Sequence, residues 1–348
     1  MRRQTKEVKI GSVTIGGENP IAIQSMLCAP LGDLAANARQ TKALYEAGCQ
    51  IGRVAIPAEG GPQLIQAIKE ASPMPLVADI QFDYRLAIES AYAGADKIRI
   101  NPGNIGDQEK VRQVVAACRE KNLPIRIGVN SGSLEREILE KYQRPTAEAL
   151  AESALLNVRL LEKFDFDNYV VAIKSSDVFT TVAAYRLAAE KLRCPFHLGV
   201  TEAGTTRMGL VKSAAAFGAL LCDGIGDTLR VSLTADPVEE IYAAKDILRG
   251  LGLLRSGPRF VSCPTCGRCQ VDLFRIAQEA EAALGNCQKD IKIAIMGCAV
   301  NGPGEARDAD IGIAGGKGEM LLFRRGEPLR KVPEGEAVAA LVEEVDRL

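Results

Sequence analysis

Short apolar runs alternate with longer amphipathic stretches between Pro20 and Gly250. Eight of the short runs are predicted strands: Ile21–Ser25, Ile51–Ile56, Pro75–Ile80, Lys97–Asn101, Pro124–Val129, Tyr169–Lys174, Pro195–Val200 and Thr228–Leu233. The stretches between them have helical periodicity: Leu34–Ala47, Tyr84–Ala93, Glu109–Lys121, Thr146–Lys163, Ser176–Lys191, Thr206–Leu221 and Val238–Gly250. Strands that alternate with helices build parallel sheets, and eight such units predict a closed (β/α)8 TIM barrel.

A doubly wound open sheet is the alternative fold, but no GxGxxG fingerprint follows the first predicted strand. Ser256-Gly257-Pro258 is the candidate linker at the end of the barrel. We therefore expect a barrel domain over residues 1–255 and a small α+β domain over residues 256–348. The elements predicted for the small domain are Val271–Leu284 and Glu334–Leu348 as helices, and Ile291–Met296, Ile311–Gly315, Glu319–Phe323 and Pro328–Val332 as strands.

Composition narrows the function classes. The chain has 348 residues, of which 47% are hydrophobic and 25% charged, as in ordinary globular proteins. A formal net charge of −1 argues against a surface for nucleic acid or anionic membrane, which needs a basic bias. No apolar run has the length of a secretory signal or a membrane helix. We expect a soluble, cytoplasmic protein.

The cysteine motif Cys263-Pro264-Thr265-Cys266-Gly267-Arg268-Cys269 is the strongest chemical signal. A CxxCxxC run is typical of iron–sulfur ligation, in which a further ligand often comes from elsewhere in the chain. Cys298, which lies in a glycine-rich loop, is the candidate for that outside ligand. Spacing alone leaves Cys269 among the candidate ligands.

Two other interpretations of these cysteines exist. A structural zinc ribbon needs two close cysteine pairs, but Cys287 and Cys298 do not form a second CxxC. Disulfides are disfavoured because nothing in the chain points to an oxidising compartment. The cysteines outside the motif are scattered among apolar neighbours, where buried inert thiols are the ordinary expectation.

Polar side chains gather at the C-terminal ends of the predicted strands, where barrel enzymes place their catalytic groups. They are Gln24, Ser25, Arg53, Asp79, Arg99, Asn101, Asn104, Arg126, Asn130, Lys174, Ser175, His197, Thr201, Glu202, Arg230 and Ser232. One arginine near a barrel strand is often paired structurally, but here five strands bring a cation to one rim. Asp79 and Glu202 are too few to neutralise them, so the pattern favours an anionic ligand such as a phosphate.

The segments FVSCPTCGRCQ and IMGCAVNGPGEA resemble the family of 4-hydroxy-3-methylbut-2-enyl diphosphate synthases of the non-mevalonate isoprenoid route. The resemblance extends through nearly the whole chain, in ADIQFDYR, RINPGNIG, PIRIGVNSGSLE, HLGVTEAG and DGIGDTLRVSLTADP. It implies an iron–sulfur oxidoreductase that opens the ring of 2-C-methyl-D-erythritol 2,4-cyclodiphosphate reductively and removes water. The product is 4-hydroxy-3-methylbut-2-enyl diphosphate.

The resemblance also implies a set of site residues. The ligands of a [4Fe–4S] cluster would be Cys263, Cys266, Cys298 and Glu305, and Cys269 would not be a ligand. A carboxylate is a harder donor than a thiolate, so Glu305 would mark the iron that is most easily opened to a substrate oxygen. The matching substrate-binding positions are Arg53, Asp79, Arg99, Asn101, Arg126, Asn130, Lys174 and Ser232, and Glu202 is the candidate for proton handling.

The expected partners follow from the same resemblance. A flavodoxin or ferredoxin would supply electrons one at a time. Because the small domain is joined by a short linker, its cluster is expected to serve a second copy in a head-to-tail homodimer.

Two positions depart from the family pattern. Gln81 stands where the family has histidine, and the loop Leu27–Pro30 lacks the usual threonines. A neutral amide cannot change charge near neutral pH. Two alternatives therefore stay open: a diverged paralogue that acts on a related diphosphate, and a non-redox barrel transferase like dihydropteroate synthase.

Overall fold

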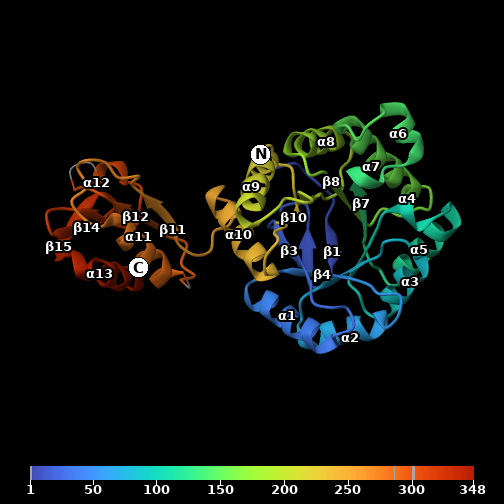
Figure 1. Ribbon diagram of the computed structural model, residues 1–348, viewed down its shortest axis with the longest axis horizontal. Coiled ribbons are helices and arrows are strands. Elements are labelled where there is room, and N and C mark those ends of the chain that lie inside the picture. The colour runs from blue at the N-terminus through green and yellow to red at the C-terminus, as the bar shows by residue number, and fades with distance from the viewer. Residues whose placement is uncertain (1, 286, 300–301) are drawn as a thin grey trace. The chain divides into compact units, whose positions relative to one another are not determined.

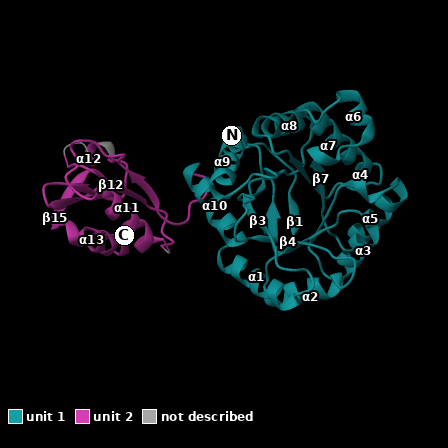
Figure 2. Ribbon diagram, viewed as in Figure 1, with its two compact units in different colours: residues 1–251 teal, residues 252–348 magenta. Residues whose placement is uncertain are grey.

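The computed structural model describes residues 2–285, 287–299 and 302–348, with Glu305 described by its backbone alone. The chain divides into two compact units, Met1–Leu251 and Gly252–Leu348 (Figure 2). The sequence placed the boundary between residues 255 and 256.

The first unit is a parallel β/α barrel (Figure 1). Its strands are β3 (Ala22–Met26), β4 (Ile51–Ala55), β5 (Leu76–Asp79), β6 (Lys97–Ile100), β7 (Ile125–Asn130), β8 (Tyr169–Lys174), β9 (His197–Gly199) and β10 (Thr228–Arg230). They run in the order β8-β7-β6-β5-β4-β3-β10-β9, and a bridge between Val171 and Phe196 joins the two ends. The prediction of a TIM barrel is confirmed.

Helices follow the barrel strands and surround the sheet (Figure 1). They are α1 (Leu34–Glu46), α2 (Gly61–Ala71), α3 (Tyr84–Tyr92), α4 (Pro102–Ile105), α5 (Gln108–Glu120), α6 (Arg136–Tyr142), α7 (Ala147–Glu162), α8 (Val178–Lys191), α9 (Thr206–Cys222) and α10 (Pro237–Gly250). An aspartate caps five of them, because its carboxylate accepts a hydrogen bond from the first turn: Asp33, Asp83, Asp107, Asp177 and Asp236. These caps fix where each loop that leaves a barrel strand ends and the following helix begins.

A hairpin that the sequence did not predict closes the amino-terminal end of the barrel. Its strands, β1 (Val8–Ile10) and β2 (Val13–Ile15), pair antiparallel. Ile10 and Ile15 are fully buried against Ile51, Val77 and Val170, which lie near the starts of their barrel strands. The barrel is therefore filled from below by apolar side chains, so the polar strand ends are left at the opposite end.

The second unit contains one mixed sheet in the order β11-β12-β13-β14-β15. The strands are β11 (Arg259–Ser262), β12 (Lys292–Met296), β13 (Ile311–Gly315), β14 (Glu319–Arg324) and β15 (Glu327–Pro333). β11, β12 and β13 are parallel, and the remaining pairings are antiparallel. Helices α11 (Leu273–Leu284) and α13 (Ala337–Asp346) bury their apolar faces against this sheet, and α12 (Gly302–Glu305) is a single short turn.

The predicted elements of both units are present, with boundaries that differ by a few residues. The sequence did not predict β11, the amino-terminal hairpin, α2, α4, α6 or α12. Within the described ranges, no helix combines the length and the apolar content needed to cross a membrane.

The hairpin gives a first prediction. Replacing the fully buried Ile10 with alanine should lower the free energy of unfolding by about 2–5 kcal/mol, because the hairpin loses apolar contact with the barrel floor. Urea unfolding followed by circular dichroism measures the change. The matched control is Lys9→Ala, since Lys9 is exposed on the same strand and should change stability by less than about 0.5 kcal/mol. Equal stability of Ile10→Ala and Lys9→Ala would contradict the role of the hairpin.

Candidate active site

Charged side chains line up across neighbouring strands at the carboxyl end of the barrel. Asp79 of β5 is in register with Arg99 of β6, and Arg99 is in register with Arg126 of β7. Residues in register share one face of a sheet, so these three side chains all enter the barrel. Gly128 makes room for them, because a Cβ atom there would lie 2.5 Å from the Nε atom of Arg99.

Asp79 is the acidic centre of this ring. Its carboxylate accepts from Arg53 Nη2 at 2.6 Å and from Arg99 Nη1 at 3.1 Å, and all three side chains are buried. Burial alone would raise the pKa of Asp79, but the charges of Arg53 and Arg99 hold that pKa far below its usual range. Asp79 therefore stays ionised and fixes two guanidinium groups.

Two other cations of the ring have no acidic partner among the described side chains. Arg126 is fully buried, and its three guanidinium nitrogens donate no hydrogen bond to a described residue. Lys174 of β8 is in register with Asn130 of β7 at the same end of the barrel. Burial, with the charges of neighbouring arginines second, lowers the pKa of Arg126 and of Lys174 well below their ordinary values. Such groups gain most from an anion that arrives with a ligand.

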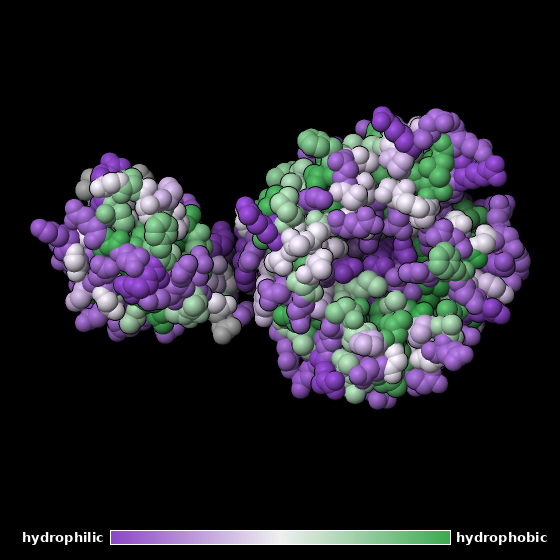
Figure 3. All heavy atoms as spheres, in the orientation of Figure 1, coloured by the Kyte–Doolittle hydropathy of each residue, from purple (hydrophilic) through white to green (hydrophobic). Residues whose placement is uncertain are grey.

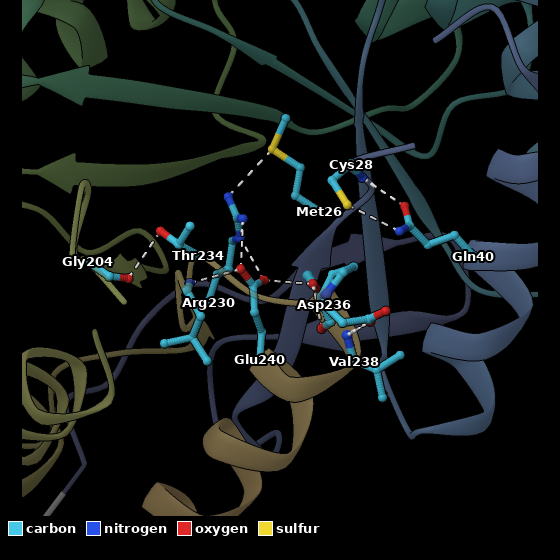
Figure 4. Close-up of polar contacts among 12 residues, drawn as sticks. Met26, Cys28, Gln40, Gly204, Arg230, Thr234, Asp236, Val238 and Glu240 are labelled. Carbon is cyan, nitrogen blue, oxygen red and sulfur yellow. Dashed lines mark hydrogen bonds and ion pairs between the residues drawn. The ribbon is translucent and has the colours of Figure 1, made fainter. Parts of the chain in front are cut away.

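The fifth cation, Arg230, has a carboxylate partner that the sequence analysis missed. Glu240 of α10 accepts from Arg230 Nε and Arg230 Nη2, each at 3.1 Å, and only 3% of Glu240 is exposed (Figure 4). The sequence feature that could have identified Glu240 is its position one turn into the helix that follows the last barrel strand. The sequence had expected Glu202 in the neutralising role.

Glu202 lies elsewhere, in the loop after β9, and is exposed. Its φ angle of 51° is left-handed, which costs free energy in a non-glycine residue and is most common at functional sites. The loop is tied to the one after β10, because the amide and hydroxyl of Thr234 donate to the carbonyl oxygen of Gly204 (Figure 4). Ser232 belongs to that second loop, so the candidate groups Glu202 and Ser232 come from connected loops.

The two candidate asparagines differ in their surroundings. The Asn101 side chain accepts from the amide of Gly103 at the start of α4 and donates to Ser133 Oγ at 3.2 Å. It therefore fixes the β6–α4 loop beside the ring. Asn130 ends β7 and is half-buried.

The atypical loop Leu27–Pro30 is held by Gln40 of α1. The Gln40 carbonyl oxygen accepts from the amides of Cys28 and Ala29, and its amide nitrogen donates to Cys28 Sγ at 3.2 Å (Figure 4). The loop is therefore ordered without threonines. Gln81, the other departure from the family pattern, is exposed in the loop after β5.

A second polar layer lies deeper in the barrel, between the ring and the apolar floor. Lys97 lies two residues before Arg99 on the same face of β6, and it is fully buried. His197, the single histidine, shares a hydrogen bond with Thr228 Oγ1 at 2.5 Å. Burial, with Arg126 second, lowers the pKa of His197 well below its ordinary value, so the imidazole is neutral at neutral pH.

Taken together, five cations of the ring face two buried carboxylates, Asp79 and Glu240. Figure 3 shows hydrophilic residues around a hollow near the middle of the barrel unit. A cavity with this charge is suited to a ligand that carries several negative charges in a small volume.

In the second unit, parallel strand ends bring the cysteine motifs to one edge of the sheet. Cys263 directly follows β11, and its amide donates to the carbonyl of Ile295 in the neighbouring strand β12. Cys298 follows the end of β12 by two residues. Thr265, between the first two cysteines of the motif, has a left-handed φ of 68°. Strain and close packing at this edge are features of a site that holds a ligand.

The third motif cysteine, Cys269, is held against the second unit. Its thiol donates to the carbonyl oxygen of Val271 and packs against the core of the second unit. A Cβ atom at Gly297 would lie 3.2 Å from Cys269 Sγ, so glycine permits this contact. Among the side chains that the structure describes, no group of three or more cysteine, histidine, aspartate or glutamate residues is gathered closely enough to hold a metal ion. The side chain of Glu305 lies outside the described atoms.

Comparison with known proteins gives the same two divisions. The GcpE TIM-barrel domain matches residues 5–245, and the GcpE protein C-terminal domain matches residues 259–347. The 4-hydroxy-3-methylbut-2-en-1-yl diphosphate synthase (flavodoxin) of Clostridium perfringens is 53% identical over 347 residues, which is 100% of this chain and 99% of that protein. The synthase of the same name from Geobacter sulfurreducens is 52% identical over 348 residues, with coverage of 100% and 99%.

Solved structures resemble the barrel alone. Dihydropteroate synthase from Stenotrophomonas maltophilia has a TM-score of 0.52 at 12% identity and covers 71% of this chain and 97% of its own. A truncated 3-deoxy-D-arabino-heptulosonate 7-phosphate synthase from Thermotoga maritima has a TM-score of 0.52 at 15% identity, with coverage of 72% and 94%. Similarity at this level of identity reports the fold.

Lys97 gives a prediction about stability and pH. Burial, with the charges of Arg126 and Arg53 second, holds the pKa of Lys97 well below its ordinary 10.5. Between the folded and ordinary pKa values the unfolded chain binds more protons, so Lys97 makes stability rise with pH in that interval. Lys97→Met should therefore raise the free energy of unfolding at about pH 7, and the gain should shrink at about pH 9.5.

Urea unfolding at the two pH values measures this difference. The exposed Lys42, replaced by methionine, is the control and should show no such pH dependence. A gain for Lys97→Met that is equal at both pH values would contradict a depressed pKa.

Proposed function

This chain belongs to the GcpE family of 4-hydroxy-3-methylbut-2-en-1-yl diphosphate synthases, and we propose that its barrel holds the cyclic diphosphate substrate in the ring of five cations. The protein is an oxidoreductase of isoprenoid biosynthesis. It converts 2-C-methyl-D-erythritol 2,4-cyclodiphosphate to 4-hydroxy-3-methylbut-2-enyl diphosphate. The reaction takes up two electrons and two protons, breaks a C–O bond to phosphate, and releases one hydroxyl group as water.

The observation that carries the binding proposal is the excess of buried cations over carboxylates. Arg126 and Lys174 have no acidic partner among the described residues, so the diphosphate would supply the missing charge. Arg53 and Arg99 are already oriented by Asp79 and offer their remaining N–H groups. Asn101, Asn130 and Ser232 add neutral donors at the same rim.

Glu202 is our candidate for proton handling. It is exposed in a strained loop at the carboxyl end of the barrel, where a substrate that fills the hollow would meet it. A carboxyl group beside a reacting carbon can donate or accept the proton that the reaction needs. The left-handed φ of Glu202 costs free energy, and such residues cluster at functional sites, which supports a functional role for this side chain.

The second unit would hold a [4Fe–4S] cluster through Cys263, Cys266, Cys298 and Glu305. The donor set fits such a group, because three soft thiolates follow adjacent parallel strands and one carboxylate offers a replaceable position. The thiol of Cys269 is bonded to the Val271 carbonyl, which supports leaving it out of the set. When bound, the cluster supplies single electrons and a Lewis acid.

The names of the curated relatives support flavodoxin as the electron donor, and ferredoxin is the second candidate. We place the reaction in the cytoplasm, as expected from the composition. The similarity to dihydropteroate synthases is confined to the fold at 12% identity, so it gives no support to a non-redox transferase.

We also propose a head-to-tail homodimer, in which the second unit of one copy covers the barrel of the other. Large apolar side chains stand exposed in segments that follow the barrel strands: Phe82 after β5, Phe179 at the start of α8 and Met208 at the start of α9. An apolar rim around a charged hollow suits a protein surface that closes over the substrate and excludes water.

The anaerobic turnover assay tests the function. Reconstituted protein, dithionite and a viologen mediator should convert the cyclic diphosphate to the open-chain allylic diphosphate, followed by mass spectrometry. Glu305→Ala should abolish turnover while iron and sulfide stay partly bound, because the three thiolates remain. The control is Glu327→Ala on the exposed edge of β15, which should keep full activity. Full activity of Glu305→Ala, or wild-type protein without sulfide, would contradict the proposed cluster.

Mixing two inactive variants tests the dimer. Arg126→Met damages the barrel and Cys298→Ser damages the cluster site, so each variant alone should be inactive. In a head-to-tail dimer of the two, one intact barrel faces one intact cluster, so each mixed dimer keeps one of its two sites. Random exchange makes half of the dimers mixed, so the mixture should recover about a quarter of wild-type activity. If each barrel used the cluster of its own chain, the mixture would stay inactive.

A further inference from the structure

The Glu240 carboxylate connects three pieces of the barrel mouth. Besides the two bonds from Arg230, it accepts from Ser25 Oγ of β3 at 2.8 Å and from the amide of Leu233 at 3.2 Å (Figure 4). β3 and β10 are neighbours in the sheet, and Leu233 directly follows the candidate substrate residue Ser232. One buried carboxylate therefore fixes a side chain of β10, a side chain of β3 and the loop between β10 and α10.

The surroundings of Glu240 suit a carboxylate. It lies in the first turns of α10, where the amino-terminal helix dipole favours an anion. Each carboxylate oxygen accepts two hydrogen bonds, so its lone pairs are satisfied despite burial. Nothing in this arrangement leaves Glu240 available to react with a ligand itself.

Arg230 is held by one edge of its guanidinium group. The bonds to Glu240 use Nε and one N–H of Nη2, which leaves three of the five N–H groups for other acceptors. One of these three, on Nη1, donates to the sulfur of Met26 at 3.5 Å near the end of β3 (Figure 4), so two N–H groups have no acceptor among the described residues. The Arg230 side chain is 18% exposed, so this free edge is reachable from outside.

The ring thus contains two kinds of cation. Arg53, Arg99 and Arg230 are oriented in advance by buried carboxylates, whereas Arg126 and Lys174 have none among the described residues. An arginine whose fork is already fixed loses less side-chain entropy when it binds a phosphate. Rigid donors select a ligand by shape, and unpaired cations attract it by charge.

From this geometry we infer that Glu240 is a positioning residue, which presents the free edge of Arg230 to a phosphate group of the substrate. The inference rests on the proposed function and extends it to a residue that does not touch the substrate. Its prediction is that loss of the Glu240 charge weakens binding of diphosphate through Arg230.

Three variants of the full-length, cluster-loaded protein test this inference. Glu240→Gln keeps the size of the side chain but removes the charge and one acceptor, so the KM for the cyclic diphosphate should rise about tenfold, with kcat within about twofold. The Kd for inorganic pyrophosphate, measured by calorimetry, should rise in parallel. Arg230→Met should raise both constants at least as much. In the double variant Arg230→Met/Glu240→Gln, binding should be no weaker than in Arg230→Met alone.

Glu239→Gln is the matched control, since Glu239 is the exposed neighbour in the same helical turn and should leave KM and Kd unchanged. Glu240→Asp replaces Glu240→Gln if the glutamine variant does not fold. Aspartate keeps the charge but has a shorter side chain, so this variant should also raise KM. A purely structural role would instead lower kcat, iron content and thermal stability, with KM unchanged.

Two outcomes overturn the inference alone: wild-type Kd for pyrophosphate in Glu240→Gln, or additive losses in the double variant. If the wild-type protein itself failed to bind pyrophosphate, the proposed binding site would fall together with this inference. The wild-type measurement therefore separates the two failures.

Discussion

The barrel mouth depends on one imbalance of charge: five buried or half-buried cations converge on two carboxylates. Removing cations from water without counter-ions is unfavourable, and the lowered pKa values of Arg126 and Lys174 express that cost. A fold can contain such a site only if the rest of the barrel contributes enough stability to offset the cost of the buried cations. In the proposed binding mode, a diphosphate that enters the mouth would bring the charge that the protein lacks, so the imbalance that strains the free protein would drive binding.

The apolar architecture makes this imbalance possible. The amino-terminal hairpin fills the lower end of the barrel with Ile10 and Ile15, so water and polar groups are confined to the upper end. Gly128 leaves the space that the Arg99 guanidinium occupies. These residues carry no chemistry, but they determine which direction the charged side chains can take.

The periodicity of the sequence predicted the eight barrel strands, because each is a compact apolar run between helical stretches. The register of parallel strands places Asp79, Arg99 and Arg126 together, and Arg53 joins them through its ion pair with Asp79, as strand-end reasoning expected. The hairpin and β11 were missed because both lie outside the alternation of apolar and helical stretches, Pro20 to Gly250, that located the barrel strands. Glu240 was missed for another reason: a glutamate in the first turns of a helix looks like an ordinary solvated residue, and only tertiary packing buries it against Arg230.

The division of chemistry between the two units sets a further constraint. The barrel holds the cations, whereas the cysteine motifs lie at the edge of a separate sheet in the second unit. In the proposed dimer, the second unit of the other copy would close over the barrel and bring the cluster close to the substrate that it reduces. Closure also excludes water, which strengthens each charge interaction inside. Rigid donors such as Arg230, fixed by Glu240 before closure, would keep the substrate in place while that surface arrives. In the proposed mechanism, the buried carboxylates would determine where the diphosphate binds, and closure by the second surface would determine when it reacts.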